Sequence, residues 1–143
     1  MFASQGRKAI ERNSVAVLES FHNTVERDIG EFSDRDAAIM FAGWLHYSIA
    51  LLIQSRRLKQ NEIPAALQSG ALAVRSAAPD HGLGDTYIEV AQGRIFDSMR
   101  EANGSPMWPL LYFARAKEDG LRVSEGAFAG ALMRETEAVA RMG

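Results

Sequence analysis

The sequence predicts an all-α fold: a compact bundle of about six helices around a central apolar helix at about residues 35–58. Apolar side chains recur mostly at three- and four-residue spacing, and no run alternates as a half-buried strand does. Glycines, prolines and capping side chains divide the chain into about six segments. With 143 residues and no linker-like stretch, residues 1–143 are expected to form a single helical domain.

The central helix is predicted from the longest stretch without a charged side chain, which runs from Ala37 to Ile53. A helix that is hydrophobic nearly all round belongs at the centre of a fold or in a membrane. This stretch is at the lower length limit for crossing a bilayer, and His46, Tyr47 and Ser48 fall near its middle. The other helices are amphipathic and need an apolar element to cover. We therefore expect a buried helix and no membrane partner.

The preceding helix is expected from about Gln5 to Ile29. Gly30 is expected to end it, because glycine readily adopts the left-handed conformation that closes helices. Ser33 or Asp34 is then expected to cap the central helix, since short polar side chains accept hydrogen bonds from the first free backbone N–H groups. The inward face of the first helix is expected to carry Ile10, Val17, Leu18, Phe21, Val25 and Ile29.

A third helix is expected to begin near Ile63 and Pro64, where proline suits the first turn. Gly70 lies beside its apolar face, so another helix can approach closely at that point. The helix is expected to end before a loop at residues 79–84, which is rich in glycine and begins with proline. A fourth helix is then expected over about residues 85–102.

A fifth, short helix is expected to begin near residue 105 or at Pro109, because proline fits only a first turn. It is expected to end at residues 119–120, and the Leu121 that follows the glycine is typical of a Schellman closure. Ser124 is expected to cap a sixth helix that continues to the C-terminus. This layout is similar to that of many bacterial regulatory and effector-binding bundles, but layout alone is not evidence of function.

Composition excludes several classes of chemistry. The chain has no cysteine, so disulfides, thiolate metal sites and thiol nucleophiles are excluded. The net charge is −2 and the basic residues form no stripe, so we expect no nucleic-acid partner. The first residues lack the apolar segment of a signal peptide, and we expect a cytoplasmic location.

Metal and catalytic motifs are each incomplete. Di-metal carboxylate bundles use two Glu-x-x-His pairs, and here only Glu19 and His22 form one, since His46 and His81 have no acid three residues before them. The chain has no Gly-x-Ser-x-Gly elbow and no Walker-type phosphate loop. We therefore expect no metal and no cofactor, and we lean towards a protein that is not an enzyme. An enzyme that uses His46 or His22 with a nearby carboxylate stays as a third hypothesis.

A possible ligand pocket is indicated by polar-tipped side chains in apolar surroundings. Trp44, His46 and Tyr47 lie together in the central helix, and each needs a hydrogen-bond partner when buried. They are candidates for lining an apolar pocket, although core residues bonded to neighbouring helices are the more ordinary outcome. Glu135 falls within the apolar line of the last helix, so its carboxylate must be paired, protonated or in a wet cleft.

Two other surfaces are candidates for binding a protein partner. Trp108, Tyr112 and Phe113 belong to a dense apolar run around a helix start, and aromatic side chains in such places are typical interface anchors. The spacing of Gly126 and Gly130 indicates a helix surface suited to close contact, within the chain or between subunits.

These observations lead to two main functional hypotheses. The first is a non-enzymatic helical interaction or regulatory protein that acts by binding a protein partner. We expect it to form a homodimer. The alternative is a helical bundle that binds a small molecule in an apolar pocket near Trp44, His46, Tyr47 and Glu135.

Overall fold

Five α-helices and one short 3₁₀ helix make up the part of the chain that the computed structural model describes, which is residues 4–77, 105 and 107–142. They are α1 (Gln5–Ile29), α2 (Asp34–Gln54), η1 (Gln60–Glu62), α3 (Ile63–Ala77), α6 (Trp108–Glu118) and α7 (Glu125–Met142). These ranges contain no strand, and the predicted all-α bundle is confirmed. The predicted loop at 79–84 and the predicted fourth helix lie outside the described residues.

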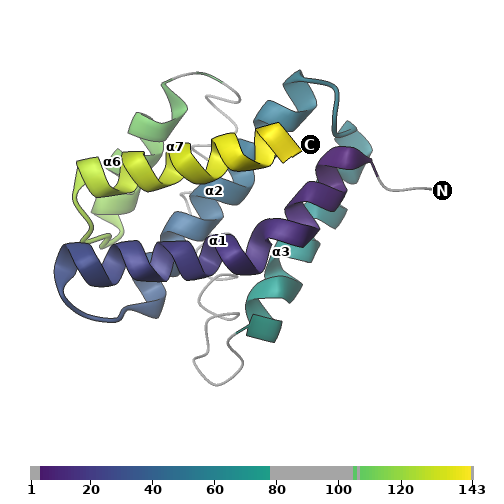
Figure 1. Cartoon of the computed structure of the whole chain (residues 1–143). Coiled ribbons are helices and arrows are strands. Elements are labelled where there is room, and N and C mark those ends of the chain that lie inside the picture. The colour runs from purple at the N-terminus through teal and green to yellow at the C-terminus, as the bar shows by residue number, and fades with distance from the viewer. Residues whose placement is uncertain (1–3, 78–104, 106, 143) are drawn as a thin grey trace.

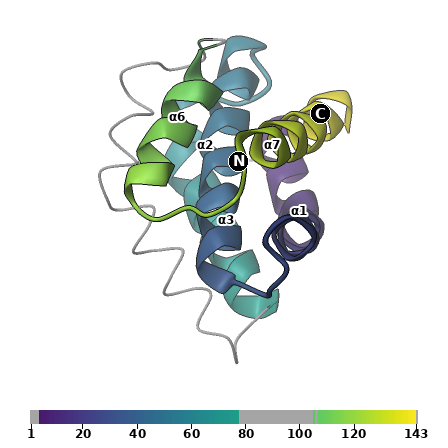
Figure 2. The ribbon, with the colours of Figure 1, turned by 90° about the vertical axis from the view of Figure 1, so that its left-hand side faces the viewer.

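The helices are arranged around α2. Helices α1 and α7 lie side by side and run in opposite directions across the front of the bundle (Figure 1). In the view turned by 90°, α2 lies between this pair and α6 (Figure 2). Helix α3 packs against both α1 and α2. Four helices thus contact α2, as expected for the central helix of the bundle.

Burial of α2 agrees with its sequence. Every residue from position 36 to position 50 is buried. By length and composition alone this helix would be able to cross a membrane, but 89% of its most apolar 18-residue window is buried inside the protein. Its apolar surface is therefore covered by the helices around it, which is the arrangement that the absence of charge from Ala37 to Ile53 predicts.

Two glycines allow neighbouring helices to approach α2 closely. A Cβ atom at Gly43 of α2 would lie 2.6 Å from Cε1 of Tyr112 on α6. A Cβ atom at Gly70 of α3 would lie 2.5 Å from Cδ2 of Leu45 on α2, so the close approach predicted at Gly70 is confirmed. Larger side chains at these positions would force the helices apart.

Most helix ends follow the sequence signals. Gly30 ends α1 with a φ of 77°, and the Ser33 hydroxyl oxygen accepts a hydrogen bond from the Asp36 N–H at the start of α2. Gly120 has a φ of 102°, and the Leu121 N–H donates to the Ala116 carbonyl, which is the predicted Schellman closure of α6.

The sequence misplaces the end of α2. The helix stops at Gln54 and not at the predicted Leu58. Arg56 adopts a left-handed conformation with a φ of 62°, and the Arg57 N–H donates to the Leu52 carbonyl at 2.8 Å. This is the hydrogen bond of a Schellman closure with arginine in place of the usual glycine. The prediction was wrong because no glycine marks the stop.

One buried carboxylate fixes the start of α7 relative to α2. Asp36 Oδ1 accepts a hydrogen bond from the Arg122 backbone N–H at 2.8 Å. Asp36 Oδ2 accepts from Arg122 Nε at 3.2 Å and Nη2 at 3.1 Å, and from the Ser33 hydroxyl at 2.6 Å. Because Arg122 lies in the turn before α7, these bonds hold that turn against the first turn of α2.

Candidate functional site

The predicted aromatic and histidine cluster on α2 lies in the core. Trp44 is 0% exposed, His46 2% and Tyr47 6%. Trp44 stacks on Phe41 of the same helix, with ring centroids 5.3 Å apart. The three side chains therefore take the ordinary position that core residues have.

Burial also determines the charge state of His46. The apolar surroundings disfavour the imidazolium form and lower the pKa of His46 to about 3. The side chain is then neutral near pH 7. It fills core space and titrates only in strong acid, which does not favour a role as a general acid or base near neutral pH.

Glu135 is paired within the chain. Its Oε2 atom accepts a hydrogen bond from the Ser20 hydroxyl of α1 at 2.9 Å and another from Arg134 Nε at 3.0 Å. The side chain therefore links α7 to α1, which is the paired state among those that the sequence left open.

The aromatic residues predicted as partner anchors form part of the core. Trp108 and Tyr112 are each 1% exposed. They continue a row of stacked rings that begins at Tyr47, with centroid distances of 5.3 Å from Tyr47 to Trp108 and 4.9 Å from Trp108 to Tyr112. Phe113 is half-buried against Phe128 of α7. These side chains join α6 to α2 and α7, and only Phe113 retains exposed surface.

The two glycines of α7 face open space. Nothing lies within 4 Å of a Cβ atom built at Gly126 or Gly130. Both residues line a hollow of about 340 Å³ between α1 and α7 that also carries Arg27, Asp28 and Arg134. Among the described residues, no atom therefore lies against these two positions of α7.

His22 lies near the turn between α1 and α2. Its Nε2 atom lies 3.7 Å from Asp34 Oδ1 at the start of α2. The ring stacks on Phe32 with centroids 4.6 Å apart. Among the described residues no group of three or more His, Asp or Glu side chains is placed to hold a metal ion.

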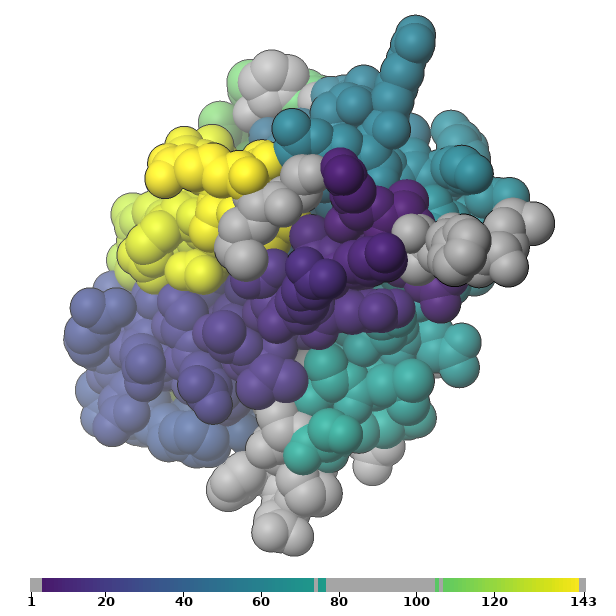
Figure 3. Space-filling model, turned by 45° about the vertical axis from the view of Figure 1, so that its right-hand side comes forward, coloured from purple at the N-terminus to yellow at the C-terminus, as the bar shows by residue number. Residues whose placement is uncertain are grey.

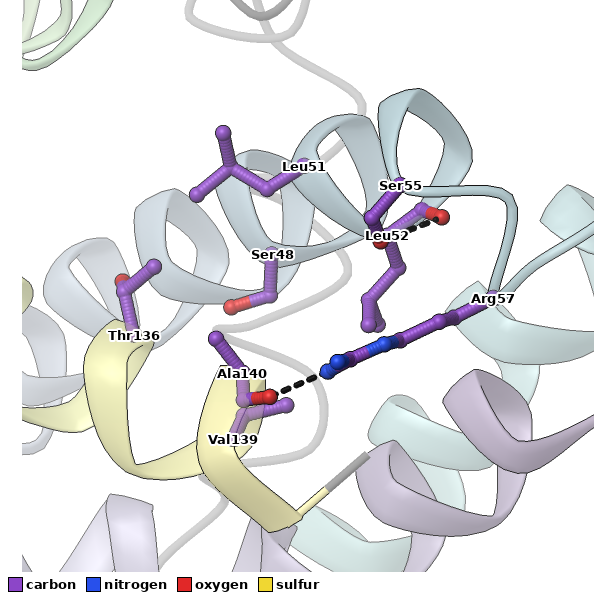
Figure 4. A pocket seen from close by; sticks show the side chains of 8 residues that line it. All are labelled: Ser48, Leu51, Leu52, Ser55, Arg57, Thr136, Val139 and Ala140. Carbon is purple, nitrogen blue, oxygen red and sulfur yellow. Dashed lines mark hydrogen bonds between the residues drawn. The ribbon is translucent and has the colours of Figure 1, made fainter.

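A pocket of about 330 Å³ lies between the C-terminal halves of α2 and α7. Figure 3 shows the C-terminal end of α7 (yellow) beside the segment that follows α2. The apolar walls of the pocket are formed by Leu51 and Leu52 from α2 and by Val139 from α7. The other lining residues are Ser48, Ser55, Arg57, Thr136 and Ala140 (Figure 4).

Two residues that line this pocket have buried hydroxyl groups without a hydrogen-bond partner among the described residues. They are Ser48 Oγ on α2 and Thr136 Oγ1 on α7, in side chains that are 2% and 4% exposed. Buried helical hydroxyls usually donate to the carbonyl four residues earlier. Ser14 and Thr24 on α1 do so, at 2.6 Å and 3.1 Å. These two hydroxyls do not. In Figure 4 both side chains lie between α2 and α7, and the Ser48 oxygen points towards α7.

Arg57 supplies the positive charge at this pocket. Its side chain reaches across from the turn after α2, and its Nη1 atom donates to the Ala140 carbonyl near the end of α7 (Figure 4). The backbone of Arg57 is held independently, because its carbonyl accepts from the Gly6 N–H at 2.9 Å and its N–H donates to Leu52. The guanidinium therefore lies at one edge of the pocket, on a backbone that is fixed from both sides.

The pocket uses the two helices that the sequence indicated, but different residues. Ser48 follows Tyr47 directly and Thr136 follows Glu135 directly, and one residue along a helix turns the side chain by about 100°. A signal was present, since Thr136 lies four residues after Leu132 on the apolar line of α7. The sequence carries no such signal for Arg57, because the position of this residue depends on the turn after α2, which the sequence misplaced.

The comparisons with known proteins add nothing to this geometry. No family model matches the chain, and neither a curated protein nor a solved structure matches it. The residues of the pocket and of the exposed surfaces therefore carry the functional argument.

Proposed function

We propose that this chain is a helical binding protein that takes a small molecule in the pocket between α2 and α7. The observation that carries the proposal is the pair of buried hydroxyls, Ser48 Oγ and Thr136 Oγ1, that have no partner among the described residues and lie at this pocket. A buried polar group without a partner costs about 1–3 kcal/mol, so the fold alone gives no reason to keep two of them.

The size and walls of the pocket favour a small ligand with an apolar body. A volume of about 330 Å³ is at the lower end of the range for ligand pockets. Leu51, Leu52 and Val139 offer apolar contact, and the hydroxyls can each donate and accept a hydrogen bond. This pattern, mostly apolar walls with a few polar groups that orient the ligand, is typical of small-molecule sites.

Titration with three matched eight-carbon probes tests the proposal. The probes are octanoate, octanamide and 1-octanol, added to the full chain and followed by the NMR signals of the methyl groups. At least one probe is expected to bind with a dissociation constant below about 1 mM and to shift the signals of Leu51, Leu52 and Val139. Ser48→Ala and Thr136→Val are each expected to weaken that binding about five- to ten-fold, because each removes one hydrogen bond.

Two hydroxyls outside the pocket provide the control. Ser14→Ala and Thr24→Val make the same chemical changes on α1, at residues that do not line this pocket. They are expected to leave the affinity unchanged. The proposal fails if none of the three probes gives a saturable shift, or if the α1 variants weaken binding as much as the pocket variants do.

A second candidate function is self-association through the outer face of α6. Met107 is 56% exposed, and Leu110 and Leu111 are 47% exposed each. These residues lie on the side of α6 that faces away from its buried residues Trp108 and Tyr112. An exposed apolar face on α6 favours burial against a partner, and a second copy of this chain offers the same apolar side chains.

Sedimentation equilibrium tests this second candidate. Burying these half-exposed side chains would contribute about 1 kcal/mol each, against an association cost of at least about 4 kcal/mol, so any dimer is expected to be weak and the measurement extends to millimolar protein. Leu110→Glu is expected to abolish the dimer, whereas Met133→Glu, at an exposed site on α7, should not. A monomer at every concentration would rule out self-association, and loss of the dimer in Gly130→Glu alone would place the interface on α7.

A further inference from the structure

We infer that the ligand of the α2–α7 pocket is a small monocarboxylate, whose carboxylate is held by Arg57, Ser48 and Thr136 and whose hydrocarbon part lies on Leu51, Leu52 and Val139. This inference rests on the proposed binding function, and it adds the charge and the orientation of the ligand. It is carried by the one charged side chain that lines the pocket together with the two hydroxyls.

The charge of Arg57 is not neutralised within the described chain. No carboxylate oxygen of the described residues lies within salt-bridge distance of its guanidinium. A guanidinium has five N–H donors, and Arg57 uses one of them on the Ala140 carbonyl. The remaining donors can hold a carboxylate, for which the planar guanidinium is well shaped.

The polar groups of the pocket all suit an acceptor. Ser48 and Thr136 can each donate one hydroxyl hydrogen, and Arg57 donates N–H groups. No acidic side chain lines the pocket, so a carboxylate there would meet no like charge from a side chain. A carboxylate has about four acceptor positions on its two oxygens, so it can accept from more than one of these residues.

The pocket lies near the C-terminal ends of α2 and α7, where helix carbonyls disfavour an anion. At α2 these carbonyls are already occupied, because the N–H groups of Ser55, Arg57 and Leu58 donate to Leu51 and Leu52. At α7 the Ala140 carbonyl is occupied by Arg57 itself. The guanidinium thus already offsets these carbonyls, and hydrogen bonds to the ionised group outweigh their residual dipole.

The comparison of octanoate with octanamide tests whether the pocket prefers a negatively charged ligand. The two probes have the same hydrocarbon chain and planar head groups of similar size, and only octanoate is an anion. Octanoate is expected to bind at least about ten-fold more tightly, because hydrogen bonds to an ionised group are about twice as strong as neutral ones. Raising the salt from about 50 mM to about 500 mM should weaken octanoate several-fold and leave octanamide unchanged.

A matched pair of arginine variants tests whether Arg57 causes the preference for octanoate over octanamide. Arg57→Gln removes the charge but keeps a donor for the Ala140 carbonyl, and it should reduce the preference for octanoate to about two-fold or less. Arg141→Gln removes an equal charge from the residue after Ala140, and its side chain is 79% exposed and paired with Glu137. This variant should retain the preference, even if Arg57→Gln lowers the melting temperature.

Each result leads to a distinct conclusion. Equal affinity for octanoate and octanamide, with both still dependent on Ser48 and Thr136, would overturn the carboxylate assignment and leave the binding function standing. A preference for octanoate that survives in Arg57→Gln, or disappears in Arg141→Gln, would overturn the role of Arg57. Failure of octanoate, octanamide and 1-octanol alike would overturn the binding function together with this inference.

Discussion

Acidification from pH 6.5 to pH 3 is expected to remove up to about 5 kcal/mol of folding free energy through His46 alone. Burial lowers the pKa of this imidazole from 6.5 to about 3, and each pH unit between these values corresponds to about 1.36 kcal/mol. In that window the unfolded chain binds a proton that the folded chain does not, so stability falls as the pH falls. Above pH 6.5 both states carry a neutral imidazole and this contribution stays constant.

Urea unfolding at several pH values measures this effect. In His46→Gln the slope of the unfolding free energy against pH, between about pH 4 and pH 6, should fall by about 1.36 kcal/mol per pH unit, the equivalent of one proton. The slope is the relevant quantity, because a buried glutamine also changes the stability at neutral pH. Equal slopes in the wild type and the variant would show that His46 is protonated in the folded state and is not in a dry core.

Replacing Asp36 by alanine is expected to destabilise the fold by about 3 kcal/mol. The buried Asp36 carboxylate accepts hydrogen bonds from the Ser33 hydroxyl and from three nitrogen atoms of Arg122. Hydrogen bonds that involve a charged group contribute about 1.5–3 kcal/mol, and loss of this carboxylate leaves the Arg122 backbone N–H without its acceptor. The turn before α7 would also lose its attachment to α2.

Glu31 provides a matched control for this prediction. Its carboxylate pairs with the same arginine, but the Glu31 side chain is 57% exposed whereas that of Asp36 is 3% exposed. Exposed ion pairs contribute only about 0–1 kcal/mol, so Glu31→Ala should have a small effect. Chemical denaturation of both variants gives the comparison. A loss in Glu31→Ala equal to that in Asp36→Ala would contradict the idea that burial sets the strength of this contact.

The sequence was sufficient to predict most of the fold because its signals are local. Gly30, Ser33 and Gly120 mark helix ends through backbone conformation and capping, which depend on few neighbours. The uncharged stretch from Ala37 to Ile53 identifies the central helix by the same kind of local argument. Arg56 shows the limit, since a residue other than glycine takes the left-handed position when the surrounding packing fixes the turn.

The candidate site was harder to predict because it depends on how two distant helices face each other. The sequence indicated α2 and α7 but selected Tyr47 and Glu135, which lie in the core and against α1. The adjacent residues Ser48 and Thr136 line the pocket. A difference of about 100° in direction separates the neighbours on each helix, and the rotation of a helix about its axis is set by packing along the whole bundle.

The prediction of an interaction surface on α6 also depended on which face of the helix the bundle covers. The apolar run from Met107 to Phe113 predicted an interaction surface built from its aromatic residues. In the structure the large rings of Trp108 and Tyr112 fill the core, and the aliphatic residues Leu110 and Leu111 remain outside. The period of 3.6 residues divides such a run between two faces, but composition alone does not say which face the bundle covers.

The stability of the hydroxyl variants tests most directly whether Ser48 and Thr136 are kept for a ligand and not for the fold. In the absence of ligand, the double variant Ser48→Ala/Thr136→Val should be about 2 kcal/mol more stable than the wild type, because two buried hydroxyls without partners are removed. The double variant Ser14→Ala/Thr24→Val makes the same changes at hydroxyls that are hydrogen-bonded, and it should gain nothing or lose about 1 kcal/mol. A pocket variant that loses as much stability as this control would contradict the account, because the two hydroxyls would then serve the fold.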